Sequence, residues 1–592
     1  MLSPVTCQTA KSVDPELEAQ IEAQKGAIAE LEHELWAGGL NEDMLDTYQG
    51  GFRRLERLIE ARGGDKRHKF VIVVPVADRP QQMRDCLDSL LDLCRAFDYG
   101  GRCDGVYRKV AVVIADDSSD EESIASNREL ATHFTGLGLA TRHFGPDDQF
   151  ALVESLGDAG RDALSTIVGR ARREAFGHKG QAVMRNIAYL ELAQVQNEDG
   201  DERVLFYSID SDQEFKVKVG TPDGDLEVCA VNFFHWLDEI FSRSDALVLT
   251  GKVVGDPPVS PAVMAGNFLE DVIGFLRQMA DSGGHAECRH HEMAEHPEGE
   301  AAYHDMADLF GFKPAAEAYR YRCPLEGDHG DADCFDHFGG RLNSFFFGEH
   351  PTRISYYQHR AMLRTVQPAR TVYAGNYVFR PEALKYFIPF AALRLRMSGP
   401  VLGRLVKADI GGRFVSANLP MLHKRTVATT GQSEFRPGIR AESEAIELCG
   451  EAERQFFGDV MLFTIERLTT MGYPQGSLPQ ATLAATLTAV HAEMLEKYGR
   501  KRRDIVEKIG RLESLLHDPV NWWNRSAEHV AAVARFESFL DNIAHNFGED
   551  SPCYERIESP ANWEKWRADL LQALVAYPED AAAWGHALAG RG

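Results

Sequence analysis

The sequence predicts an α/β protein in which a mostly parallel β-sheet has helical regions before and after it. Between Lys69 and Asp210, three continuous apolar runs alternate with two stretches of helical spacing, which is typical of a parallel sheet. After about Ser433, apolar residues follow helical spacing to the end of the chain. The expected parts are an N-terminal helical segment at 1–66, a sheet domain at 67–432 with an insertion at 261–350, and a helical C-terminal domain at 433–592.

Composition and charge limit the classes of function. A chain of 592 residues exceeds a single hydrophobic core, so about two to four domains are expected. The net charge of −26 argues against nucleic acid or an anionic membrane as the main partner, because both attract basic surfaces. We expect a cytoplasmic protein with no transmembrane segment, since no signal-peptide pattern and no apolar run of roughly 18 residues is visible. The ten cysteines are scattered, so a disulfide framework is not expected.

The first predicted element is a helix over 14–36, which Gly38 and Gly39 end. Its apolar residues recur at heptad spacing over fewer than three heptads, which is short for an independent coiled coil. Two hypotheses follow. The helix packs on its own chain, or it forms a homodimer contact, for which the C-terminal helices offer a second place.

The sheet domain follows with strands and helices in alternation. Continuous apolar runs, as expected of strands buried on both faces, lie at 69–77, 109–120 and 203–210. Helical spacing occupies 79–97 and 179–195 between them, and strand-like runs return within 371–387 and 411–426. Two of the strands end in acids: Asp116-Asp117 closes the second, and Asp210 with Asp212 closes the third. Parallel sheets bind ligands beyond the carboxyl ends of their strands, so these carboxylates are expected to converge.

The pair Asp210 and Asp212 suggests metal chemistry. Two carboxylates in Asp-x-Asp at a strand end make an oxygen-rich site that suits Mg²⁺ or Mn²⁺. Magnesium is commonly bound through one or two carboxylates together with substrate phosphates, so the expected ligand is a nucleotide diphosphate. The alternative is a solvated loop with unrelated acids.

Five motifs carry a family resemblance, in the order "VIVVPVADRPQQMRDCLDSLL", "VVIADDSSD", "KGQAVMRN", "SIDSD" and "GNYVFRPEAL". Together they resemble glycosyltransferases of the GT-A fold, especially the family 2 type, over about residues 69–430. The resemblance implies a nucleotide-diphosphate sugar donor such as a UDP- or GDP-sugar, a hydroxyl acceptor, and Mn²⁺ or Mg²⁺.

The resemblance also assigns roles to individual residues. It implies nucleotide or donor binding by Pro75, Val76, Arg79, Asp116, Asp117, Lys179, Arg185, Asp210 and Arg425. It places Gly375 and Asn376 on the acceptor side, and it makes His423 a third metal ligand beside Asp210 and Asp212. Lys424 and Arg425 would neutralise the leaving diphosphate. Two alternatives stay open: Asp116-Asp117 caps a helix, and His423 is structural.

The chain departs from the family 2 pattern where a Glu-Asp pair usually supplies the base. The corresponding stretch, Arg396 to Pro400, contains no acid. By residue type alone, Glu270, Asp271 and Asp409 are the candidate bases. The absent acids favour a retaining reaction, like that of the mannosylglycerate and glucosyl-phosphoglycerate synthases, which this chain resembles in combining Asp-x-Asp with a late histidine.

The insertion contains a second group of metal-ligand types. Four tetrahedral zinc ligands are available from Cys288, His290, His291, Cys323 and Cys334, with His291 as the preferred histidine. The alternative is a polar surface loop.

The sequence therefore predicts a metal-dependent hexosyltransferase. Two rival functions remain open. A nucleotidyltransferase of similar fold normally has a glycine-rich loop after the first strand, and "VPVADRPQQ" has no glycine. A non-catalytic nucleotide-sugar-binding protein is favoured only by the missing Glu-Asp pair.

Overall fold

The computed structural model describes residues 15–170, 173, 176–198, 203–221, 224–256, 260–284, 287–291, 321–427, 432–433, 440–442 and 445–590. Its centre is an eight-stranded sheet in the order β12-β14-β10-β13-β6-β1-β4-β5. The strands are β1 (Lys69–Val76), β4 (Val110–Asp116), β5 (Ala140–Phe144), β6 (Val204–Ile209), β10 (Val248–Thr250), β12 (Gln367–Pro368), β13 (Asn376–Phe379) and β14 (Phe414–Ser416).

The sheet is mixed but mostly parallel, which confirms the predicted α/β class. Strand β1 pairs in parallel with β4 and β6, β4 with β5, and β10 with β14. Strand β13 runs antiparallel between β6 and β10, and β12 runs antiparallel to β14. The sequence analysis placed β1, β4 and β6 within a few residues, but it did not foresee the short strand β10.

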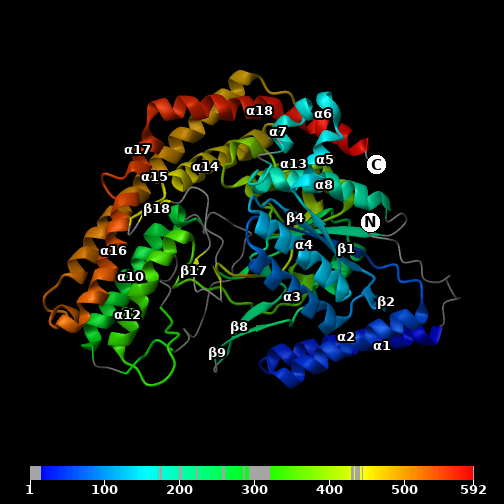
Figure 1. The fold of residues 1–592 in the computed structure, drawn as a ribbon, viewed down its shortest axis with the longest axis horizontal. Helices are drawn as coiled ribbons and strands as arrows, with labels where there is room; N and C mark the ends of the chain where they lie inside the picture. The colour runs from blue at the N-terminus through cyan, green and yellow to red at the C-terminus, as the bar shows by residue number, and fades with distance from the viewer. Residues whose placement is uncertain are drawn as a thin grey trace.

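Both faces of the sheet are covered, which explains the continuous apolar runs. Along β1, Phe70, Ile72 and Val74 enter one core, while Val71 and Val73 enter the other. Helices on the first face are α3 (Pro80–Phe97), α4 (Glu121–Gly136) and α9 (Phe233–Arg243). Helices on the second face are α5 (Pro146–Glu154), α7 (Ser165–Val168), α8 (Gln181–Glu198) and α13 (Ser398–Ile410), and α6 (Gly157–Ala163) connects α5 to α7 (Figure 1).

The N-terminal segment is a helical hairpin of α1 (Pro15–Ala37) and α2 (Glu42–Arg62), lying below the sheet in Figure 1. The predicted helix over 14–36 is confirmed over its described part, and residue 14 lies outside the described residues. The apolar seam of α1 is buried at Ile21, Ile28 and Leu35, and these residues share one core with α2 and α3. The structure therefore supports packing on its own chain as the role of this seam.

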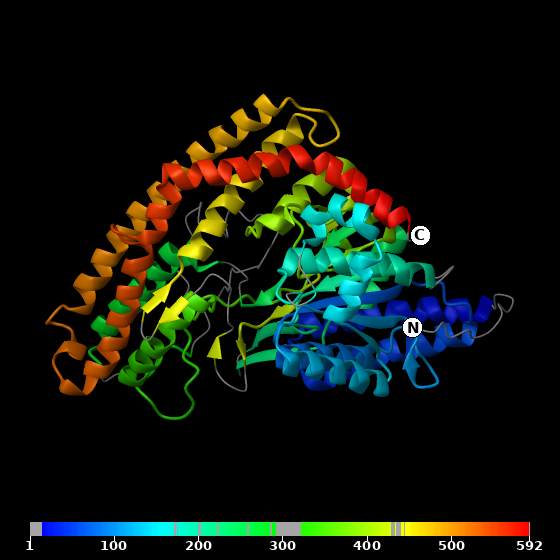
Figure 2. The ribbon, with the colours of Figure 1, turned by 45° about the horizontal axis from the view of Figure 1, so that its top comes forward.

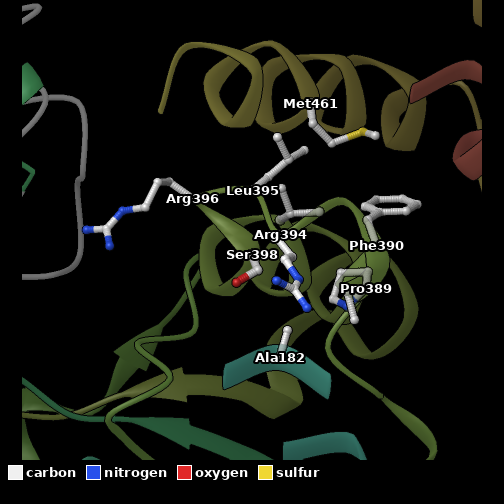
Figure 3. Close-up of a pocket in the computed structure, with 10 residues that line it drawn as sticks. Ala182, Pro389, Phe390, Arg394, Leu395, Arg396, Ser398 and Met461 are labelled. Carbon is white, nitrogen blue, oxygen red and sulfur yellow. The ribbon is translucent and has the colours of Figure 1, made fainter. Parts of the chain in front are cut away.

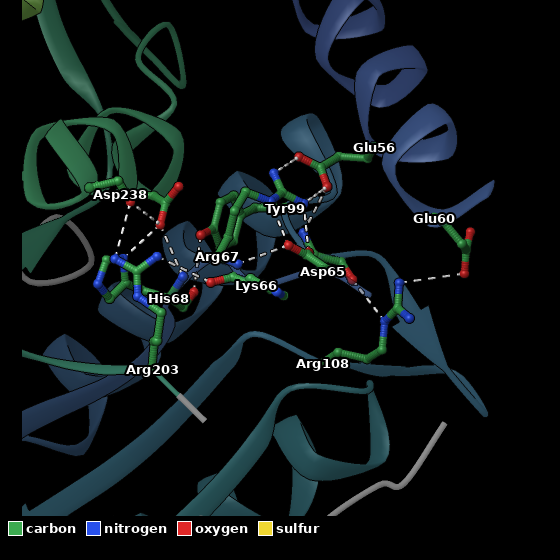
Figure 4. A network of polar contacts seen from close by, with 12 residues as sticks. Glu56, Glu60, Asp65, Lys66, Arg67, His68, Tyr99, Arg108, Arg203 and Asp238 are labelled. Atoms are coloured by element: carbon green, nitrogen blue, oxygen red, sulfur yellow. Dashed lines mark hydrogen bonds and ion pairs between the residues drawn. The ribbon is translucent and has the colours of Figure 1, made fainter. Parts of the chain in front are cut away.

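An ion-pair network holds the hairpin to the sheet (Figure 4). The guanidinium of Arg67 donates to both oxygens of buried Glu56 on α2, at 2.7 and 2.6 Å, and to Asp65. The guanidinium carbon Cζ of Arg67 lies 4.6 Å from the ring centre of Tyr99. Burial raises the pKa of Glu56, and the bonds from Arg67 offset only part of that rise. Removing either partner of this pair would leave a buried charge without its counter-charge.

The C-terminal region is helical, as predicted, and consists of α14 (Cys449–Thr470), α15 (Gln480–Leu516), α16 (Val530–Phe547), α17 (Pro552–Glu558) and α18 (Pro560–Ala589). Figure 2 shows these helices as an arch that begins beside the sheet, extends away from it and returns along α18. At the return, the indole N–H of Trp584 donates to the carbonyl of Leu384 at 2.8 Å. The arch is therefore anchored to the sheet domain at both ends.

The expectation that residues 261–350 form an insertion over the sheet is wrong for the part that the structure describes. Helix α10 (Pro261–Ser282) packs on α15, and α12 (Asp331–Arg341) packs on α16 (Figure 1). The indole N–H of Trp522 donates to the carbonyl of Met279 at 2.7 Å, which ties α10 to the C-terminal helices. Helical spacing in α10 was hidden because most of its faces are apolar and buried.

Small elements complete the fold. Three two-residue strands, β7 (Gln213–Glu214), β11 (Val254–Gly255) and β15 (Leu422–His423), form a second sheet beside the end of β6. The remaining hairpin strands are β2 (Arg102–Cys103), β3 (Val106–Tyr107), β8 (Val217–Thr221), β9 (Gly224–Val228), β16 (Thr426–Val427), β17 (Gln432–Ser433), β18 (Arg440–Glu442) and β19 (Ala445–Glu447). Short 3₁₀ turns are η2 (Leu342–Phe347), η3 (Met362–Thr365), η4 (Pro381–Lys385), η5 (Ala391–Leu393), η6 (Gly411–Arg413), η7 (Trp522–Asn524) and η8 (Ala527–His529). Among the described helices, none is both long and apolar enough to cross a membrane.

Candidate functional site

The acids predicted to converge do follow neighbouring strands at one edge of the sheet. Strand β1 lies between β4 and β6, and Val76 at its end is in register with Asp116 at the end of β4. Asp210 and Asp212 follow β6 at the same edge, and the amide of Asp117 donates to the carbonyl of Val76 at 2.7 Å. Pro75 and Val76 are apolar and buried within β1, so only their backbone groups can offer polar contacts at this edge.

Asp212 lies at the centre of a buried charged group. Its Oδ2 is 3.4 Å from Nε2 of His423 and 3.3 Å from Nη1 of Arg425. Its Oδ1 is buried and has no hydrogen-bond partner among the residues that the structure describes. Burial by itself would raise the pKa of Asp212, but His423, Arg425 and Arg79 outweigh it, so the pKa lies well below its ordinary value. The carboxylate is therefore ionised, and one of its oxygens is unused.

The second small sheet places His423 against Asp212. Strand β15 pairs with β7, directly after Asp212, and with β11, directly before Asp256. Nδ1 of His423 is 2.6 Å from the carbonyl oxygen of Asp256. A carbonyl only accepts, so Nδ1 carries a proton, and Nε2 is the ring nitrogen that faces Asp212.

Asp256 is a further acid of this site that the sequence analysis did not single out. Its Oδ2 accepts from the amide of Arg425 at 2.8 Å, and burial raises its pKa. It is the last residue of the short stretch "KVVGD", in which apolar residues lead to an acid, as they do at the ends of β4 and β6. That shared pattern is the signal from which it could have been found.

Asp210 points to a different set of partners. Its Oδ1 accepts from Nε2 of Gln181 at 2.9 Å and forms an ion pair with Arg185, both on α8. Gly375 approaches so closely that a Cβ there would lie 2.5 Å from Oδ2 of Asp210. Arg185 is thus committed to Asp210, and Gly375 leaves room for the carboxylate.

Asn376, predicted on the acceptor side, is a fully buried residue at the start of β13. Its amide nitrogen donates to the carbonyls of Lys252 and Leu419, at 2.7 and 3.0 Å, and its oxygen accepts from the hydroxyl of Tyr207 at 2.8 Å. Through these bonds it joins the ends of three strands. Gly375 is the residue of this pair that lies against the acids.

Asp117 holds the loop before α8. Its Oδ1 is 2.6 Å from the amine of Lys179, and its two oxygens accept from the amides of Lys179 and Gly180 at 3.1 Å. Both charged side chains are about 5% exposed. Burial is the main cause that lowers the pKa of Lys179, and Asp117 offsets part of it.

Asp116 is fully buried and accepts from the amide of Ser118, from Asn127 and from Nε2 of His143. The helix-cap hypothesis for Asp116-Asp117 is wrong, because Asp120 caps α4 by accepting from the amide of Ser123 at 2.8 Å. Asp116 instead fixes the turn at the end of β4.

Arg79 brings a further cation to the edge. It precedes α3, directly after the left-handed residue Asp78, whose φ is 53°. Burial is the main cause that lowers the pKa of Arg79, and the nearest charges are Asp212, Arg425 and Asp210. The predicted donor residues Arg79 and Arg425 therefore lie together beside Asp212.

The three candidate bases have partners elsewhere in the fold. Glu270 on α10 pairs with Arg511 of α15 at 3.1 Å, and buried Asp271 accepts from Thr352 and Arg353. Asp409 near the end of α13 pairs with Lys385 at 2.8 Å. These three contacts are with Arg511, with Thr352 and Arg353, and with Lys385, and not with Asp210 or Asp212.

A small pocket of about 20 Å³ lies between α8 and the loop before α13 (Figure 3). Arg396 and Ser398, from the stretch where the family pattern has acids, line it together with Ala182, Phe390, Arg394 and Met461. Figure 3 shows Arg394 directed toward Ala182 and Arg396 pointing away. The Nε atom of Arg394 lies 4.0 Å from the position that a Cβ would occupy at Gly180. The pocket thus offers a cation where the sequence lacks acids.

A second group of ligand types is formed by the Cys/His cluster, which consists of Cys288, Cys323, His329 and Cys334. Their ligand atoms all lie within 4.8 Å of one another, so the cluster is able to bind a metal such as zinc. The choice of His291 is corrected by the structure: the histidine that joins the three cysteines is His329, and the ring of His291 packs edge-on against it at 5.0 Å. Within the described ranges, Asp210, Asp212 and His423 form no comparably tight group.

A scan against protein-family models and a search of the curated proteins found no match to this chain. Its function is therefore argued from the residues and their geometry.

Proposed function

We propose that this protein is a metal-dependent glycosyltransferase that moves a hexose from a nucleotide-diphosphate sugar to a hydroxyl acceptor. One observation carries the proposal: the buried carboxylate of Asp212 has one oxygen without a hydrogen-bond partner among the described residues, and its other oxygen lies 3.4 Å from Nε2 of His423. A divalent cation satisfies both groups, and imidazole beside carboxylate is an accepted ligand set for Mn²⁺.

The contact that the other ring nitrogen of His423, Nδ1, makes with Asp256 fits this role. Metal-binding histidines commonly donate their other ring N–H to a carbonyl or carboxylate, and His423 donates Nδ1–H to the carbonyl of Asp256. In the proposed site Asp212 and His423 hold Mn²⁺ or Mg²⁺, with Asp210 next to them. When bound, the ion supplies Lewis-acid stabilisation to a diphosphate leaving group.

The surrounding residues are suited to a diphosphate sugar. Arg79 and Arg425 provide the positive charge that a departing diphosphate requires. The ends of β1 and β4 offer the edge at which doubly wound sheets bind nucleotides. These features support a GT-A type of domain, in which Pro75 to Arg79 line the nucleotide and Gly375 faces the sugar.

Ligand-dependent melting tests the proposal directly. We expect UDP or GDP with Mn²⁺ to raise the melting temperature, since a ligand at 100 times its Kd stabilises by roughly 2.7 kcal/mol. Asp212→Asn should abolish the Mn²⁺-dependent part of the shift. Asp409→Asn, whose partner is Lys385 on the surface, is the matched control and should keep it.

The same measurement can refute the metal role. A proton, instead of a metal ion, would also reconcile Asp212 with His423. In that case the nucleotide shift would be equal in Mn²⁺ and in excess EDTA.

A product assay separates the three hypotheses, which are a glycosyltransferase, a nucleotidyltransferase and a non-catalytic binding protein. Incubation with candidate sugar nucleotides should release nucleoside diphosphate and free or transferred hexose. A nucleotidyltransferase would instead release pyrophosphate from a nucleoside triphosphate and a sugar phosphate. A binding protein would shift its melting temperature without turnover.

A further inference from the structure

The Cys/His cluster has the distances of a tetrahedral metal centre. The sulfur of Cys334 lies 3.3 Å from that of Cys288 and 3.5 Å from that of Cys323. Nε2 of His329 is 3.2 Å from the sulfur of Cys323. A zinc ion about 2.3 Å from each sulfur separates the sulfurs by roughly 3.8 Å, so small movements bring all four atoms to one ion.

The surroundings prepare these atoms to be ligands. Nδ1 of His329 lies 2.7 Å from the carbonyl of Gly327, so it carries the proton and Nε2 presents a lone pair to the sulfurs. The amide of His290 donates to the sulfur of Cys288, and the amide of Leu325 donates to that of Cys323, both at 3.4 Å. Such N–H groups stabilise thiolates, the form that binds metal.

Three chain segments meet at the cluster. The amide of Cys288 donates to the carbonyl of His329 at 3.3 Å, and the amide of Cys323 donates to the carbonyl of His290 at 3.0 Å. Cys334 lies in the first turn of α12. The cluster thus joins the segment after α10, the segment before His329 and the start of α12.

Helix α12 transmits this connection to the C-terminal helices. Phe335, directly after Cys334, stacks on Trp523 and on Phe536 of α16, with ring centres 5.2 and 4.6 Å apart. On the other side, Phe275 of α10 packs against Phe338 of α12 at 4.5 Å. An ion in the cluster would therefore fix α12 between α10 and α16.

We propose that the Cys/His cluster binds one structural Zn²⁺. The ligand set of three thiolates and one imidazole is typical of zinc, and four protein ligands leave no position open for a substrate. The site is distinct from the proposed catalytic metal site, whose ligands are oxygen and imidazole and which lies at the sheet edge. Its role is to fasten α12 within the helical arch.

Metal content of the full-length wild-type chain is the first test. We expect about one equivalent of zinc per chain by elemental analysis after extensive dialysis. Replacement by Co²⁺ should give the thiolate-to-cobalt absorption bands of a tetrahedral site. Asp212→Asn should retain the zinc, which separates this proposal from the proposed function.

Matched variants test the ligand assignment. His329→Ala should lower zinc retention against a competing chelator at least tenfold, whereas His291→Ala, only one ring away, should retain it like the wild type. Cys334→Ser should lose the zinc, whereas Cys103→Ser, a cysteine on the β2–β3 hairpin, should not. If Cys334→Ser does not fold, the two histidine variants still decide the assignment.

Two results would overturn the proposal. One is wild-type protein, purified with zinc present throughout, that contains no metal and keeps its melting temperature in strong chelator. The other is a disulfide between two of the three cysteines, seen as fewer than ten reactive thiols after denaturation without reductant.

Discussion

Replacing Asp117 with asparagine removes the negative partner of a buried lysine and changes little else in shape. In the wild type, Asp117 is the carboxylate that meets the amine of Lys179 at 2.6 Å, and both side chains are about 5% exposed. Asparagine keeps one oxygen for the backbone amides of Lys179 and Gly180, but it places an NH₂ group where the second oxygen accepted. The lysine is then buried without its counter-charge.

Two estimates of the cost agree. Removing one partner of a buried ion pair typically costs about 3–5 kcal/mol of unfolding free energy. Alternatively, Lys179 gives up its proton in the folded state. An ordinary lysine pKa of 10.5 lies 3.5 pH units above neutral, so deprotonation at pH 7 costs roughly 5 kcal/mol. The expected loss for Asp117→Asn is therefore about 3–5 kcal/mol at pH 7.

The second estimate predicts that the loss of unfolding free energy depends on pH. A lysine whose pKa is lowered by folding binds fewer protons in the folded state, so stability rises with pH up to the unfolded pKa. The penalty of Asp117→Asn should therefore shrink by about 1.4 kcal/mol for each pH unit between pH 7 and pH 9. The double variant Asp117→Asn/Lys179→Met, which removes both charges, should recover most of the loss.

Urea denaturation at pH 7, 8 and 9, with hydrogen exchange of the β4 and α8 amides, measures these differences. The reasoning fails if Asp117→Asn costs less than about 1 kcal/mol at pH 7, and a larger loss that does not depend on pH would mean that Lys179 keeps its proton in the folded variant. The double variant also tests the nucleotide hypothesis. If its stability is restored while its affinity for UDP or GDP falls more than tenfold, Asp117 contacts the nucleotide directly in addition to holding the loop.

Four further outcomes are expected. Asp212→Ala should abolish transfer without unfolding the protein, and EDTA should inactivate the wild type until Mn²⁺ or Mg²⁺ is restored; full activity in excess chelator would contradict this. Arg67→Met should destabilise by about 3–5 kcal/mol in urea, because it leaves buried Glu56 without its counter-charge; a loss below 1 kcal/mol would contradict the network. Burial raises the pKa of Asp459 to about 7, so its folded form binds a proton that the unfolded form lacks between pH 4 and pH 7; wild-type stability should fall as pH rises through that window, and less so in Asp459→Asn. The product should keep the anomeric configuration of the donor by NMR, and an inverted product would direct attention to a base.

The central sheet was predictable because its strands are buried on both faces. Strands β1, β4 and β6 are continuous apolar runs for that reason, and the acids at the ends of β4 and β6 mark one edge of the sheet. Strand β10 was missed because three residues carry too little pattern. Helix α10 was expected to belong to an insertion. Its apolar surface is covered by α15, which lies about 200 residues later in the chain, so no local pattern indicated its partner.

The roles of individual acids were less predictable, since spacing does not show where a carboxylate points. Asp210 and Asp212 are two residues apart, yet one pairs with Arg185 on α8 and the other faces His423 on β15. In the same way, His291 and His329 were equivalent as residue types. The fold brings His329 to the three cysteines, and Nδ1 of His329 lies 2.7 Å from the carbonyl of Gly327.

The candidate metal site depends on the least predictable part of the fold. His423 reaches Asp212 only because β15 pairs with β7 on one side and β11 on the other, each through two residues. Asp256, at the end of β11, then supplies the carbonyl that sets the tautomer of His423. A change at Asp256 that shifts this carbonyl should therefore weaken Mn²⁺ binding, although the side chain of Asp256 is not a ligand in the proposed site. The proposed chemistry rests on two local signals, Asp-x-Asp and a late histidine, whereas the place where they meet depends on backbone pairing between β7, β11 and β15, which no local pattern predicts.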